Sequence, residues 1–142
     1  MSRASMSISE YFRRLDAPLV NHMWSWGGVR GSDDAVVLRV WQDRERKIDG
    51  RWYTMVLSNV AEPTDPGNYG RLERMRHLAL IRGGARCYFV MCEAKDVNAT
   101  PRSIKSFNER EVFIGGPFVE IDGHCWIERA GRVTARELMA KT

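Results

Sequence analysis

The chain has 142 residues, of which 44% are hydrophobic, and this size and composition favour one compact domain with a single core. Its formal charge is +4, and the basic residues are mostly arginine, which suits contacts with phosphate or guanine but equally reflects arginine-rich codon usage. Because the amino terminus lacks the apolar run of a signal peptide and no stretch is long enough to span a membrane, we expect a cytoplasmic protein without a membrane partner.

The amino-terminal segment predicts a short helix followed by a hairpin. Ser7 and Glu10 have capping-box spacing, so a helix is expected over 7–16, with three apolar side chains facing the core: Ile8, Phe12 and Leu15. Residues 20–43 then read as two strands joined by a turn at GSDD. In the second strand, alternation places Val36, Leu38 and Val40 on one face and Val37, Arg39 and Trp41 on the other.

The middle of the chain predicts a turn, a strand and the clearest helix. Residues 44–51 read as a polar turn with Asp49 and Gly50 at its tip, and 51–60 as a third strand. The helix is expected over 68–84, with an inward stripe of Leu72, Met75, Leu78 and Ala79. Its other surface would then carry several basic side chains, namely Arg71, Arg74, Arg76, His77 and Arg82, against a single acid, Glu73.

The carboxy-terminal half predicts a buried central strand over 85–94, a long basic loop over 95–110, and two strands over 111–121 and 124–130. Thr134 and Glu137 form a second capping box, so a helix is expected over about 133–141. The element order predicts an α+β fold in one domain, residues 1–142 with a core of about 8–128. We expect its curved, mostly antiparallel sheet to form an open barrel with flanking helices.

Two patterns bear on catalysis. Glu93 and Lys95, at the end of an apolar strand, resemble the E-x-K of metal-dependent nucleases, and Asp65 could complete a Mg²⁺ site. A whole helix separates Asp65 from Glu93, however, and this weakens the nuclease hypothesis. The three histidines and three cysteines lack metal-ligand spacing. We therefore predict no metal, no cofactor and no catalytic residues.

The remaining signal is a concentration of aromatic and basic side chains. In an extended chain, Trp24 and Trp26 would share one face, where they could line a pocket for a flipped base or simply fill the core. The candidate pocket residues are Trp24, Ser25, Trp26, Trp41, Asp43 and Asp96, in which the polar members would read the base edge. The candidate phosphate contacts are Arg30, Arg71, Arg74, Arg102 and Lys105.

Four runs, MWSWGGV, VVLRVWQD, YGRLERMRHLALIRGGARCYFVMCEAKD and PRSIKSFNEREVFIGG, together resemble the amino-terminal specificity domains of HNH-type restriction endonucleases. Those domains look like members of the PUA superfamily, which includes the EVE, YTH and SRA-type readers of modified bases. The resemblance covers about residues 8–128. It implies a small curved barrel with an aromatic-walled pocket beside a carboxylate or amide. Trp24, Trp26 and Trp41 would match the walls, and Ser25, Asp43 or Asp96 the edge reader.

The chain carries no HNH domain, so the resemblance does not imply cleavage. The expected function is a nucleic-acid-binding module, with DNA favoured over RNA, that reads a modified base and either only binds or recruits a nuclease partner. Two alternatives stay open: a Mg²⁺-dependent nuclease using Asp65, Glu93 and Lys95, and a protein-interaction adaptor of a mobile element.

Overall fold

A computed structural model describes residues 6–58, 69–99 and 102–141 of the chain. The elements are α1 (Ile8–Arg14), β1 (Gly27–Val29), β2 (Val36–Trp41), β3 (Glu45–Ile48), β4 (Arg51–Leu57), α2 (Tyr69–Arg82), β5 (Cys87–Ala94), β6 (Ile104–Phe107), β7 (Glu111–Ile121), β8 (His124–Thr134) and α3 (Ala135–Met139). The prediction of an α+β fold is confirmed. None of the helices among the described residues is both long and apolar enough to cross a membrane.

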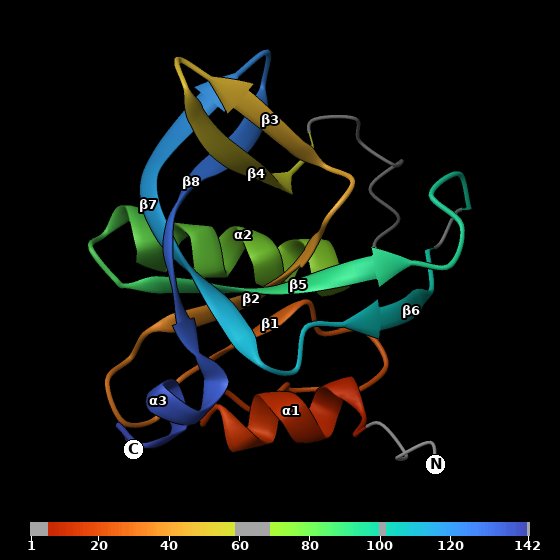
Figure 1. Ribbon diagram of the computed structural model, residues 1–142, viewed down its shortest axis with the longest axis vertical. Helices are drawn as coiled ribbons and strands as arrows, with labels where there is room; N and C mark the ends of the chain where they lie inside the picture. Colours follow the sequence, from red (N-terminus) through yellow and green to blue (C-terminus); the bar gives the residue numbers. More distant parts are fainter. Residues whose placement is uncertain (1–5, 59–68, 100–101, 142) are drawn as a thin grey trace.

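The strands form one sheet of eight in the order β1-β2-β5-β7-β8-β4-β3, with β6 paired to β5. All the pairs are antiparallel except β2 with β5. The sheet is open, because its two end strands, β1 and β3, are not paired with each other. Figure 1 shows the long β7–β8 hairpin bending through the molecule, with α1 and α3 together at one end and α2 apart from them.

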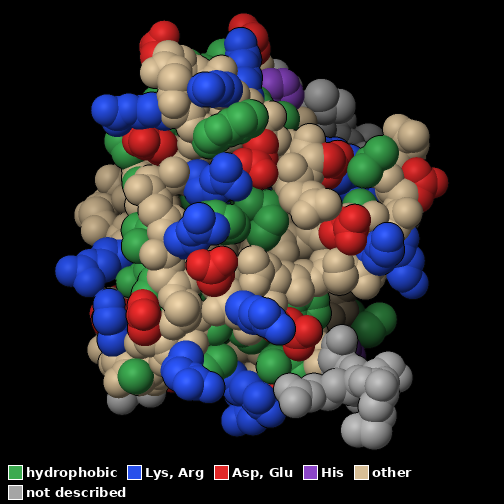
Figure 2. Space-filling view, in the orientation of Figure 1, with side chains coloured by type: hydrophobic (Ala, Val, Ile, Leu, Met, Phe, Trp, Pro, Cys, Tyr) green, Lys and Arg blue, Asp and Glu red, His purple; other side chains and the backbone are tan. Residues whose placement is uncertain are grey.

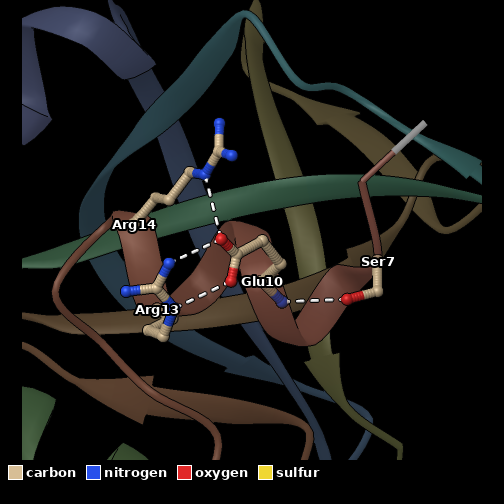
Figure 3. A network of polar contacts seen from close by, with 4 residues as sticks. All are labelled: Ser7, Glu10, Arg13 and Arg14. Atoms are coloured by element: carbon tan, nitrogen blue, oxygen red, sulfur yellow. Dashed lines mark hydrogen bonds and ion pairs between the residues drawn. The ribbon is translucent and has the colours of Figure 1, made fainter. Parts of the chain in front are cut away.

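The amino-terminal helix begins where its sequence predicts. The hydroxyl of Ser7 accepts a hydrogen bond from the backbone N–H of Glu10 at 3.1 Å (Figure 3). The Glu10 carboxylate accepts from Arg13 and Arg14, and these bonds, that of Arg13 foremost, lower the pKa of Glu10 to about 2. Phe12 and Leu15 are buried as expected, together with Tyr11.

Two hydrophobic clusters lie on opposite faces of the sheet, as the alternation along β2 predicts. Val37 belongs to a cluster with α1 and α3. Val36, Leu38 and Val40 belong to the other cluster, which α2 covers through Leu78. The central strand β5 is buried on both faces and divides its residues in the same way, so that Cys87 and Cys92 lie in different clusters and are free thiols.

The β7–β8 hairpin confirms the two predicted strands and their turn at Asp122 and Gly123, both of which have positive φ. Strand β8 continues to Thr134, four residues beyond its predicted end. The Thr134 hydroxyl accepts from the backbone N–H of Glu137 at 3.0 Å and begins α3. Leu138 of this helix is fully buried, so the core extends past residue 128.

Two short strands were wrongly predicted as turn or loop. They are β3, which lies within the predicted polar turn, and β6, which lies within the predicted basic loop. Only their end residues are partly buried, and their central side chains are exposed and polar. Short, charged strands are typical of sheet edges. Because such strands bury few side chains, their sequences lack the alternation of apolar and polar residues that predicts a strand. The tip between β3 and β4 is at Asp49 and Gly50, as predicted.

The segment before β1 is not extended, and this corrects the predicted first strand. Asn21 starts a turn: its side-chain oxygen accepts from Met23 N, and its carbonyl accepts from Ser25 N. Strand pairing begins only at Gly27. The geometry that would place Trp24 and Trp26 on one face of a strand is therefore absent.

Helix α2 has the predicted bounds but a different orientation. Leu78 is buried as expected, whereas Leu72 and Met75 are about half exposed, at 47% and 50%, and Ala79 is exposed. The stripe that faces the sheet is polar and consists of Gly70, Glu73, Arg74, His77 and Leu78. The predicted inward stripe was wrong at Leu72, Met75 and Ala79 but right at Leu78. Glu73 and Arg74 face inward because they satisfy buried backbone and hydroxyl groups, which apolar side chains could not do.

Candidate nucleic-acid interface

Glu73 anchors the tryptophan-bearing loop to α2. Its carboxylate is 2% exposed and accepts from the Ser25 hydroxyl at 2.8 Å and from the backbone N–H of Trp26 at 2.8 Å. The Ser25 hydroxyl also accepts from the backbone N–H of Asn21 at 2.9 Å. Ser25 is fully buried and its hydroxyl is engaged on both sides, so it is not positioned to read a base. This corrects its assignment to the pocket.

Arg74 bridges the open side of the sheet. Its guanidinium donates to the carbonyls of Val56 in β4 at 2.6 Å, of Arg39 in β2 at 2.6 Å, and of Trp26 at 3.0 Å. The residue is 3% exposed, and burial lowers its pKa to about 10. Arg74 therefore joins strands that share no ladder. It is a structural arginine and not the predicted phosphate contact.

Arg30 is likewise buried and engaged with its own chain. Its guanidinium donates to the carbonyls of Leu15 at 3.0 Å and Leu138 at 3.1 Å and pairs with Asp33 at 2.8 Å. These bonds tie the ends of α1 and α3 to the turn after β1. With no exposed surface, Arg30 cannot reach a phosphate, and its predicted role is corrected.

The three pocket tryptophans do not form one cage. Trp24 lies beside Tyr69 of α2, with ring centroids 5.5 Å apart. Trp26 packs under the same helix: a Cβ at Gly70 would lie 2.3 Å from the Trp26 Nε1, and the Arg74 guanidinium lies 5.7 Å from its ring centroid. Trp41 instead packs against the cluster on the α1 side of the sheet.

The remaining predicted pocket residues are engaged elsewhere. Arg102 lies over the Trp41 ring at 5.3 Å and donates two hydrogen bonds to Asp43, at 2.7 and 2.8 Å, which lower the pKa of this carboxyl. Asp96 is exposed and accepts from the backbone N–H of Asn98 at 2.9 Å. Asp43 and Arg102 therefore form an ion pair over Trp41, and Arg102 also donates to the carbonyl of Val97, next to Asp96, at 2.7 Å. With their polar groups engaged in this way, these residues do not form the predicted base pocket.

The other two predicted phosphate contacts, Arg71 and Lys105, and the predicted nuclease residues do not come together in one site among the described residues. Arg71 is partly buried and donates to the Ser58 carbonyl at 2.9 Å. Lys105 is exposed and lies 4.0 Å from Glu93, whose carboxylate also accepts from the Ser106 hydroxyl. Lys95 is exposed, and Asp65 lies outside the described residues. Within the described ranges, no three acidic, histidine or cysteine side chains are grouped to hold a metal ion.

A different aromatic and charged group, whose members are not among the predicted pocket residues, lies on the β3–β4 hairpin and on β7 and β8. Trp52 is 45% exposed, and the guanidinium of Arg129 lies 5.9 Å from its ring centroid and 4.8 Å from that of Phe113. Glu45 approaches this guanidinium, with Oε2 3.0 Å from Nη1. We call Glu45, Lys47, Trp52, Phe113 and Arg129 the Trp52 cluster.

Strand register explains why most of these side chains share a face. Lys47 is the cross-strand partner of Trp52, and Glu45 is the partner of Thr54, two residues further along β4. Tyr53 pairs with Glu128, so Trp52 and Arg129 are the next opposed positions of β4 and β8. Glu45, Lys47 and Trp52 belong to one hairpin, whereas Phe113 and Arg129 come from β7 and β8, far away in the sequence, so local spacing could not have revealed that Arg129 completes the cluster.

Two buried polar atoms in or beside the Trp52 cluster have no hydrogen-bond partner among the described residues. Within the described part of the chain, Glu45 Oε2 makes an ion pair but no aligned hydrogen bond, and the buried Thr54 hydroxyl has no partner. Around the cluster, the hairpin exposes three cations: Arg46, Lys47 and Arg51. Figure 2 shows basic and acidic side chains interspersed over one face of the molecule, with no continuous basic surface on the side drawn.

Comparison with known proteins finds no family model that matches the chain, no similar curated protein and no similar solved structure.

Proposed function

We propose that this protein is a DNA-binding module, without catalysis of its own, that stacks a base on the Trp52 cluster. The observation that supports this most directly is the half-exposed indole of Trp52, with a guanidinium over it and three exposed cations on the same hairpin. Stacking a base on an aromatic side chain contributes about 1–3 kcal/mol, and cations attract phosphates in any sequence. Strand register places Lys47 on the same face as Trp52, whereas Arg46 and Arg51 alternate to the opposite face of the hairpin, where Arg51 pairs with Glu128 at 3.5 Å.

Each member of the cluster has a distinct proposed role. Trp52 and the Arg129 guanidinium supply flat surfaces for the base. Glu45 accepts a hydrogen bond from an exocyclic amine, as carboxylates do with cytosine. Arg46, Lys47 and Arg51 contact phosphates. The preference for DNA over RNA, for a modified base, and for a PUA-like barrel rests on the family resemblance, with which the open, curved sheet bridged by Arg74 is compatible.

The test is a fluorescence anisotropy panel of short duplexes that carry plain, methylated, hydroxymethylated or glucosylated cytosine, or methylated adenine. Trp52→Ala is expected to weaken binding about tenfold, which corresponds to the loss of one stacked base. Trp24→Ala is the matched control, because Trp24 is also a partly exposed tryptophan but lies beside α2. Circular dichroism verifies that both variants fold.

Three results would replace this proposal. Loss of binding in Trp24→Ala alone would move the base to the Trp24–Tyr69 pair. Equal affinity of both folded variants and wild type for all duplexes would remove base stacking altogether. Plasmid cleavage in Mg²⁺ that disappears in Glu93→Ala would establish the nuclease alternative. Discrimination among the duplexes that is lost in Glu45→Gln would support Glu45 as the residue that reads the base.

A further inference from the structure

The outer face of α2 is an apolar stripe. Because successive residues of a helix are about 100° apart, Leu72, Met75 and Ala79 lie opposite the buried stripe of Glu73, His77 and Leu78. Leu72 and Met75 expose 47% and 50% of their surface, and Ala79 is exposed. The helix thus buries Glu73 and Arg74 and exposes Leu72 and Met75, the reverse of what is usual at these positions of a surface helix. An exposed apolar stripe of this kind marks an interaction surface.

Basic side chains flank this stripe on both sides. By the same helical geometry, Arg76 lies along one edge and Arg71 and Arg82 along the other. The only acidic residue of α2, Glu73, is buried, so the exposed charges of the helix are all positive. Arg82 pairs with Glu120, and Arg71 donates to Ser58, which leaves Arg76 as the clearest flanking charge. The electrostatic complement of this surface is an apolar ridge bordered by acids.

We propose that the outer face of α2 docks an acidic amphipathic helix of a protein partner. The spacing of Leu72, Met75 and Ala79, at i, i+3 and i+7, is the spacing with which one helix packs along another, and flanking charges select the partner. Met75 adds an adaptable, unbranched contact. A second copy of this chain is disfavoured as the occupant, because pairing two such faces would bring arginines against arginines. Nucleic acid is disfavoured because the centre of the face is apolar.

This docking surface is independent of the proposed DNA site. The Trp52 cluster lies on β3, β4, β7 and β8, whereas the stripe lies on α2, so each can be removed by substitutions that leave the other unchanged. A module built in this way could hold DNA and a protein partner at the same time. Because the two surfaces are separate, an experiment that contradicts DNA binding at the Trp52 cluster would not contradict docking on α2, and the reverse also holds.

The test uses a fluorescein-labelled amphipathic peptide of about three heptads, with leucine along its apolar seam and glutamate at the flanking positions. Its control is the same peptide with lysine in place of glutamate. Binding to the full chain is measured by fluorescence anisotropy. We expect the acidic peptide to bind in preference to the basic one, and the double variant Leu72→Gln with Met75→Gln to weaken binding about tenfold.

A matched variant and a charge swap sharpen the result. Val97→Gln changes a side chain that is equally exposed, at 47%, but lies in another part of the fold, and it is expected to leave binding unchanged. Arg76→Glu should reduce the preference for the acidic peptide and improve binding of the basic one. The thermal midpoint of each variant shows that the fold is intact, which is expected because all four side chains are exposed.

Four outcomes would overturn the proposal. They are equal binding of both peptides, unchanged binding in the Leu72→Gln and Met75→Gln variant, a dimer in sedimentation that this variant abolishes, and tighter binding to vesicles of phosphatidylcholine and phosphatidylglycerol than to the acidic peptide. The last two would assign the face to a second copy or to a membrane.

Discussion

The carboxylate of Glu73 accepts a hydrogen bond from the hydroxyl of Ser25 at 2.8 Å, across 48 residues of sequence. Both groups are buried, and the same carboxylate accepts from the backbone N–H of Trp26. The contact explains two departures from expectation at once. It turns the charged stripe of α2 inward, and it holds the loop before β1 in a turned conformation instead of a strand.

Glu73→Ala should lower the free energy of unfolding by about 3 kcal/mol, because it leaves the Ser25 hydroxyl, the Trp26 N–H and the neighbouring Arg74 without a buried acceptor or counter-charge. Ser25→Ala removes one of these bonds and should cost about 1 kcal/mol. Urea unfolding followed by tryptophan fluorescence measures both. A cost for Glu73→Ala below that of Ser25→Ala would contradict the anchoring role.

Arg74→Met should destabilise the fold by about 3 kcal/mol, because it removes three buried hydrogen bonds from the guanidinium to the carbonyls of Val56, Arg39 and Trp26, of which the Trp26 carbonyl keeps its bond from the Arg39 N–H. Arg74→Lys should recover only part of this, since an ammonium lacks the fork that reaches several acceptors at once. Arg76→Met is the control on the same helix, where the side chain is exposed and the expected change is within about 0.5 kcal/mol. Equal costs for Arg74→Met and Arg76→Met in urea unfolding would refute the bridging role.

Reversing the charge of the hairpin, with Arg46→Glu and Lys47→Glu together, should weaken binding to every duplex alike and flatten its dependence on salt. Each phosphate contact contributes about −0.9 to the slope of log K against log salt. Arg110→Glu is the control, because Arg110 is exposed but precedes β7 on another part of the surface. Anisotropy titrations between low and moderate salt measure the slope. Wild-type affinity that does not change with salt would remove phosphate binding from the proposal.

The free energy of unfolding should fall as the pH drops below about 6.5, the ordinary pKa of histidine, in part through His77. Burial, assisted by Arg74 and Arg76 and opposed by Glu73, lowers the pKa of His77 in the folded state. The unfolded chain then binds a proton at a pH where the folded chain does not, so acid favours unfolding until the pH reaches the lower folded value.

In urea unfolding at pH 7.5 and 5.5, His77→Gln should therefore show a smaller loss of stability than wild type, whereas the exposed His22→Gln should behave as wild type does. Parallel losses in all three proteins would mean that other groups carry the acid dependence.

Local signals predicted most of the fold and little of the site. Hydroxyl caps at Ser7 and Thr134, the turns at Gly50 and Gly123, and the alternation along β2 each involve residues that are neighbours in sequence. Edge strands β3 and β6 lack such a signal because they bury almost nothing.

The orientation of α2 was missed for another reason. Hydrophobic spacing identifies an apolar stripe but does not say whether that stripe faces the core. Here the other side of the helix faces the sheet, because Glu73 and Arg74 form hydrogen bonds with a buried hydroxyl and with carbonyls that are distant in the sequence. The contact of Arg129 with Trp52 and the burial of Arg30 against Leu138 were not predicted either, because each joins residues that are far apart in the sequence. The number of arginines available to contact phosphate was therefore overestimated, since Arg30 and Arg74 are buried.

The parallel pairing of β2 with β5, in which Val36 lies opposite Cys87, has a consequence for the order in which the chain folds. When β2 leaves the ribosome, its neighbour on one side has not been made, and β1 is all that it can pair with. The sheet can be completed only after β5 emerges and closes a long loop, an event that depends on contacts far apart in sequence and is therefore slow. Until then the apolar edge of β2 is uncovered, and chains truncated before β5 should aggregate during synthesis.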